Sequence, residues 1–208
     1  GVPLQDITAV RRVTFVMNTL DQPDTQDPAG LSAAQVAADR RQVNPTVLKF
    51  DTRKTVRQDQ AGITVEQRLG AQDHLRASVY TGQRAVRQYQ AIPVPAPPSL
   101  NTYAGGVIDL GTDFDGYSAN WIHDGALLGR PLFVTGGIEQ ELMRQKRRGY
   151  DNNLGAIGAL RRDEDDNVTS SNLFAQADWR FLERISATLG VRRTLVRFDS
   201  RDHFITAS

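Results

Sequence analysis

The feature that most constrains the fold is a long alternation of apolar and polar residues near the C-terminus, in residues 171–200. In residues 173–181 every second side chain is apolar, and most of the side chains between them are polar. After a short turn at 182–184, residues 185–191 repeat the pattern. A period of two residues is that of a β-strand, so this stretch predicts two long antiparallel strands joined by a tight turn.

Beyond Arg193 the alternation changes phase, because Leu195 keeps the earlier face while Val196 and Phe198 lie on the other, which predicts a β-bulge. Strands of soluble proteins usually run about 5–6 residues, and these run about twice as long. Membrane barrels need spans of about 9–11 residues, with apolar side chains toward lipid and aromatic side chains at the interface. The hairpin therefore predicts an all-β fold: an antiparallel meander of long strands that is a segment of a transmembrane outer-membrane β-barrel.

The rest of the chain repeats the alternation and predicts about seven strands in all, the first in residues 7–20. Short turns are predicted at 70–73, 128–130 and 182–184, and long loops near 21–46, 93–116 and 149–170. In outer-membrane barrels the short turns face the periplasm and the long loops face outward. Ser32 is expected to cap a short helix in 31–42, within the first long loop.

One face of these strands is expected to meet lipid. Its predicted members share apolar side chains at every second position: Ile63, Val65, Ala77, Val79, Leu132, Val134, Ala175, Ala177, Leu189 and Val191. Glu66, Gln176 and Arg180 are expected on the opposite face. A shift of one residue in register would exchange the two sets.

Composition excludes several classes of function. The net charge of +1 gives no argument for nucleic-acid binding, and the absence of cysteine excludes disulfides and thiol chemistry. His74, His123 and His203 lack the spacing of metal ligands, so no metal or cofactor is expected. The common catalytic motifs are missing as well, which predicts that the protein is not an enzyme.

The chain resembles the barrel of TonB-dependent outer-membrane receptors, in particular the ferric-siderophore branch. The resemblance rests on soft strand and loop patterns in residues 51–56, 79–84, 106–110, 147–152, 160–164 and 171–200. It implies uptake of a ferric siderophore, contact with outer-membrane lipid and lipopolysaccharide, and coupling to the TonB complex through an N-terminal part that these residues lack. Residues 1–208 are then expected to be a partial barrel without the plug domain, unable to transport or to close alone.

The resemblance also implies a ligand site. Ferric siderophores are often anionic and aromatic, which suits arginine forks and a tyrosine on an extracellular loop. The candidates lie on or beside the loop predicted at 149–170: Arg144, Arg147, Arg148, Tyr150, Arg161 and Arg162. Two alternatives remain open for these cations, pairing with the acidic residues 163–166 or contact with lipopolysaccharide phosphates.

A second function class also remains open at this point. The chain is then a small complete outer-membrane barrel or a soluble β-protein with binding or hydrolytic activity. Glu139 and Glu141, two residues apart on one strand face, are the carboxylates such an activity would use, although an ordinary polar lumen has the same pattern.

Overall fold

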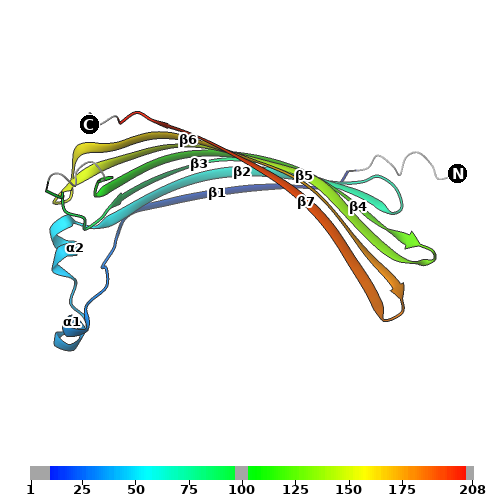
Figure 1. The fold of residues 1–208 in the computed structure, drawn as a ribbon, viewed down its shortest axis with the longest axis horizontal. Helices are drawn as coiled ribbons and strands as arrows, with labels where there is room; N and C mark the ends of the chain where they lie inside the picture. The colour runs from blue at the N-terminus through cyan, green and yellow to red at the C-terminus, as the bar shows by residue number, and fades with distance from the viewer. Residues whose placement is uncertain (1–9, 97–102, 205–208) are drawn as a thin grey trace.

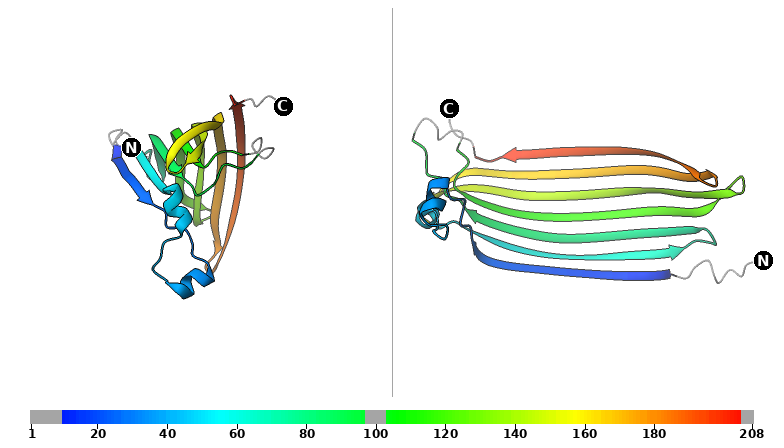
Figure 2. Two further views of the ribbon diagram at one scale, coloured as in Figure 1. Left: turned by 90° about the vertical axis from the view of Figure 1, so that its left-hand side faces the viewer. Right: turned by 90° about the horizontal axis from the view of Figure 1, so that it is seen from below.

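The computed structural model describes residues 10–96 and 103–204 and shows one antiparallel sheet of seven strands in chain order (Figure 1). Each strand pairs with its neighbours in sequence, as the meander prediction requires. The strands are β1 Val10–Gln26, β2 Arg53–Arg68, β3 Asp73–Tyr89, β4 Val107–Leu127, β5 Arg130–Asn153, β6 Ala156–Leu182 and β7 Ile185–Asp202. The sheet is long and bowed, with β1 and β7 at its two edges (Figure 2).

Two short helices, α1 Ala33–Ala38 and α2 Pro45–Phe50, lie in the connection between β1 and β2. Ser32 caps α1 as predicted, because its hydroxyl accepts a hydrogen bond from the Gln35 backbone while the Gln35 side chain bonds back to Ser32. Within the described residues, neither helix is long and apolar enough to cross a membrane. We call the end of the sheet that carries them the helix end and the opposite end the turn end (Figure 1).

The three short turns lie at the turn end where the alternation predicts them, after Arg68, Leu127 and Leu182. Leu128 and Gly129 have φ of 53° and 73°, the left-handed pair that a two-residue turn between twisted strands requires. The same geometry recurs at Leu154 and Gly155, with φ of 52° and 94°. This last turn joins β5 to β6 at the helix end.

The prediction of a long loop at 149–170 is therefore wrong. β5 continues to Asn153, and β6 begins at Ala156 and runs for 27 residues. The polar composition that indicated a loop belongs to two strands whose opposite charges face each other, with Lys146 opposite Asp165 and Arg148 opposite Asp163. The other two long connections are present with shifted bounds, at 27–52 and 90–106.

The registers confirm the predicted apolar face. All ten residues of the predicted lipid-facing set fall on one side of the sheet, for example through the pairs of Ile63 with Val79 and of Ala177 with Leu189. Glu66 and Gln176 fall on the other side. We call the side with the apolar set the outer face and the opposite side the inner face.

The bulge predicted near Arg193 is wrong, because β6 and β7 pair without interruption from Trp179 to Glu164. The change of phase has another cause. Near Arg193 the outer face becomes polar, while the inner face gains apolar side chains such as Phe198, which lies opposite Val168. The change of phase therefore marks where charged residues enter the outer face of β7, and it does not require an extra residue.

The apolar side chains of the outer face form a belt across the strands. Its last apolar residue toward the helix end is Met17 on β1, and successive pairings carry the Met17 row through Leu142 on β5 to Arg197 on β7. On β7 the last apolar residue of this face is Leu195, two residues nearer the turn end than Arg197.

The buried core of the described residues is small and lies at the helix end. Its apolar members are Val47, Phe50, Val56, Tyr89 and Val107, which come from α2 and from the ends of β2, β3 and β4. The most buried polar side chain there is Asn152, at 2% exposure. This part of the molecule therefore holds the connections in fixed positions.

Candidate functional site

The six cations and aromatics predicted to bind ligand lie on strands and are not gathered on one loop. Arg144, Arg148 and Tyr150 lie on the outer face of β5, whereas Arg147 lies on its inner face. Successive strand residues point to opposite faces, so neighbours in sequence are separated by the thickness of the sheet. The predicted cluster therefore divides into two groups.

The outer-face arginines have carboxylate partners. Arg144 Nη2 lies 3.0 Å from Asp115 Oδ2, and Arg148 Nε lies 3.2 Å from Asp163 Oδ1. A neighbouring pair of the same kind joins Arg87 to Asp109 on β3 and β4 at 2.7 Å. Pairing with the acids of 163–166, which the sequence left open, is confirmed for Arg148. These arginines link adjacent strands.

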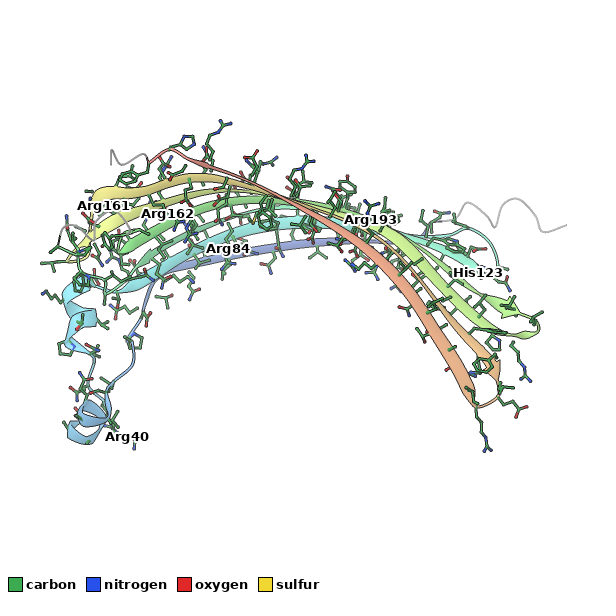
Figure 3. All side chains as sticks on the ribbon, viewed as in Figure 1. Arg40, Arg84, His123, Arg161, Arg162 and Arg193 are labelled. Carbon is green, nitrogen blue, oxygen red and sulfur yellow. The ribbon has the colours of Figure 1, made fainter. Side chains whose placement is uncertain are left out.

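The two β6 arginines are also paired. Arg161 makes a two-pronged contact with Asp151, both distances being 2.9 Å, and the Asp151 side chain is only 8% exposed. Arg162 Nε lies 2.7 Å from Glu164 Oε1. The pKa of the nearby Tyr103 hydroxyl is raised, mainly by burial and to a smaller extent by the Asp151 carboxylate. Figure 3 places both arginines at the helix end, far from His123 at the turn end.

Asn152 links the three connections of the helix end. Its amide nitrogen donates to the backbone oxygens of Phe50 and Gln90, each at 2.9 Å, and its amide oxygen accepts from the Gly155 nitrogen at 2.8 Å. Arg53 adds a second link, because its guanidinium lies 3.7 Å from the Tyr89 ring centre and donates to the Gly155 oxygen at 3.1 Å. The connections therefore form one packed unit.

The inner face carries cations of a different kind. Within the described residues, no carboxylate lies within 4.0 Å of the side-chain nitrogens of Lys54, Arg84 or Arg147. Lys54 and Arg84 line a hollow of about 760 Å³, and Arg147 lies directly opposite Leu110, which also lines it. From the strand spacings, the three Cα atoms form a triangle with sides of roughly 12–16 Å.

Two aromatic side chains form the floor of this hollow toward the turn end. Tyr80 on β3 lies across Gly116 on β4, and Phe114 on β4 lies across Gly82 on β3, so that a Cβ at either glycine would overlap the ring. The ring centres are 6.4 Å apart. The Tyr80 hydroxyl donates to Glu141 at 3.1 Å.

Sequence reasoning retained Arg147 and missed Lys54, Arg84, Tyr80 and Phe114 as members of one surface. The sequence does contain a signal for this surface, because on each strand these five residues alternate with the apolar positions and so fall on the opposite face. Which of these cations have acidic neighbours depends on the pairing of strands, and single-strand periodicity does not contain that information.

The family described as TonB dependent receptor-like, beta-barrel matches residues 5–207, which is nearly the whole chain.

Proposed function

Because the chain belongs to the TonB-dependent receptor-like β-barrel family, a family of outer-membrane proteins, we propose that its strands form part of the wall of a receptor for ferric siderophores. TonB-linked transport of a ligand across the outer membrane is the function of that family. Short turns of such barrels face the periplasm, so the helix end is the extracellular end. The inner face then borders the lumen through which a ligand enters. The proposed role is binding and transport, without enzymatic chemistry.

The observation that carries the proposal is a group of three cations on the inner face without a carboxylate partner. Arg87, Arg144 and Arg148 on the outer face are paired with cross-strand carboxylates, whereas within the described residues Lys54, Arg84 and Arg147 have no carboxylate within 4.0 Å. Lys54 and Arg84 line the hollow together with Asp115 and Glu141, and hydrogen bonds to charged groups are about twice as strong as neutral ones. An anionic iron chelate is the ligand that this arrangement favours.

The proposed ligand set therefore changes from the one that the sequence suggested. Arg147 stays, and Lys54 and Arg84 join it. Arg144, Arg148 and Arg161 instead hold adjacent strands together through carboxylates within 3.2 Å, and Arg162 is paired with Glu164 on its own strand. Tyr150 shares the outer face with Arg148.

Lipid is the second proposed partner. The apolar belt on the outer face would meet the hydrocarbon of the membrane, and the polar band between it and the helix end would meet lipopolysaccharide. In this band Arg57, Arg87, Arg144 and Arg148 each lie within 3.2 Å of a carboxylate, whereas within the described residues Lys146, Arg193 and Arg197 have no carboxylate within 4.0 Å. We therefore expect lipopolysaccharide phosphates to meet both paired and unpaired cations.

The test uses the full-length protein and two double variants. Arg84→Ala with Arg147→Ala removes lumen charge, and the matched control Arg144→Ala with Arg148→Ala removes the same charge from the outer face. Binding of siderophores loaded with radioactive iron is measured at equilibrium, one tricatecholate and one trihydroxamate, with heat-resistant migration as the check of assembly. Two lost charge-assisted bonds at partly exposed positions are expected to weaken binding about tenfold or more.

The control is expected to change affinity by less than about twofold, because exposed ion pairs contribute little. Failure of the unsubstituted protein to bind any ferric chelate would retire the proposed function. An equal loss in the two double variants would show instead that the lumen cations have no special role.

A further inference from the structure

The Tyr80 and Phe114 rings, which we call the aromatic platform, lie over the backbone of their glycine partners, with ring planes inclined at 51° to each other. Gly116 and Gly82 present no side chain, so each ring packs on backbone with one side and turns the other toward the lumen. Tyr80 is 39% exposed despite this packing. The glycines therefore make room for rings whose open sides line the hollow.

The platform is fixed in orientation. The Tyr80 hydroxyl reaches across β4 to Glu141 on β5, so the ring spans two strand gaps and is held at both ends. A surface held in this way binds a planar group without paying much to order its own side chains.

Charge is distributed unevenly around the platform. Arg84 lies opposite Thr112, two residues from Phe114 toward the extracellular end, which places its Cα roughly 8 Å from that of Phe114. Glu141 lies opposite Gly116, in the same row as Tyr80 and two residues nearer the turn end than Phe114. An anionic group on the Phe114 ring is therefore attracted toward the extracellular end by Arg84 and repelled from the turn end by Glu141, which orients the ligand along the strands.

We propose that the aromatic platform binds an aryl group of a net-negative ferric chelate, so that the receptor selects catecholate or phenolate chelates over neutral hydroxamates. This inference rests on the proposed function, since it names the ligand class of the same site. An aryl donor gains both ring stacking on Tyr80 and Phe114 and attraction to Lys54, Arg84 and Arg147. A neutral hydroxamate chelate has neither the ring nor the charge.

The experiment compares Tyr80→Leu with Tyr80→Phe in the full-length receptor. The phenylalanine variant keeps the ring and loses the bond to Glu141, so it isolates stacking from hydrogen bonding. A ferric tricatecholate and a neutral ferric trihydroxamate, both loaded with radioactive iron, serve as probes in equilibrium binding. We expect Tyr80→Leu to weaken tricatecholate binding about fivefold to tenfold, as for other aromatic contacts, and Tyr80→Phe to change it less than about twofold.

Trihydroxamate binding, if measurable, is expected to be weaker and unaffected by either variant. If Tyr80→Leu does not assemble, Phe114→Leu removes the second ring and gives the same comparison. Equal affinity for the two probes, or equal loss of both in the leucine variant, overturns the inference and leaves the proposed function standing. Absence of binding by both probes overturns the two together.

Discussion

Replacing Asn152 by alanine tests whether the extracellular connections form one cooperative unit. The side chain is 2% exposed and makes three hydrogen bonds of 2.8–2.9 Å, two to backbone oxygens of other connections and one from its own turn. Alanine cannot replace any of them. The change therefore leaves the Phe50 and Gln90 oxygens and the Gly155 nitrogen without this partner.

The size of the effect follows from those three groups. Each lost bond costs about 0.5–1.5 kcal/mol net, and a buried group left without a partner costs about 1–3 kcal/mol. Water that enters the vacated volume recovers part of this loss, so we expect about 2–3 kcal/mol for opening of the unit. At 1.4 kcal/mol per factor of ten, local opening becomes about 30-fold to 150-fold more frequent.

Hydrogen exchange of the folded receptor measures this opening directly. Peptides covering 44–56 and 103–110 contain amides bonded within the unit, such as the Gly106 nitrogen that donates to the Tyr150 oxygen at 2.7 Å. Asn153→Ala is the matched control, because the adjacent Asn153 is exposed. Exchange in these peptides that is no faster for Asn152→Ala than for Asn153→Ala would refute the cooperative unit. Peptides in the belt are expected to stay unchanged in both variants.

Three further outcomes are expected. Gly82→Ala should lower the heat resistance of the folded barrel, because the new Cβ overlaps the Phe114 ring, whereas Gly111→Ala, which has open space around it, should change it little. Spin labels in the full-length protein should report lipid at Val65 and water at Glu66; the reverse would mean that the faces are assigned wrongly. Residues 1–208 refolded alone in detergent should aggregate or pair edge to edge, because β1 and β7 are edge strands and lipid does not satisfy their free backbone groups; a closed, heat-resistant monomer would contradict this.

Much of the fold was predictable because lipid imposes a strict pattern. Alternation placed the predicted apolar set on one side of the sheet on every strand where it was read, and the turn after Leu127 is recognisable because Gly129 supplies a left-handed conformation. The same signal weakens where a strand leaves the membrane. There the outer face has no reason to be apolar, so residues 149–170 have the composition of a loop and the structure of a hairpin.

The site was less predictable than the fold, and Arg147 and Arg148 show why. They are neighbours in the sequence, and each lies opposite an acidic residue of β6: Glu164 for Arg147 and Asp163 for Arg148. Asp163 pairs with its cross-strand arginine, whereas Glu164 is held by Arg162 on its own strand at 2.7 Å. Competition for one carboxylate therefore leaves the inner arginine charged toward the lumen and neutralises the outer one. Arg147 and Arg148 carry the same charge and are neighbours in the sequence. Only their pairing in space decides which of them can meet an anionic ligand.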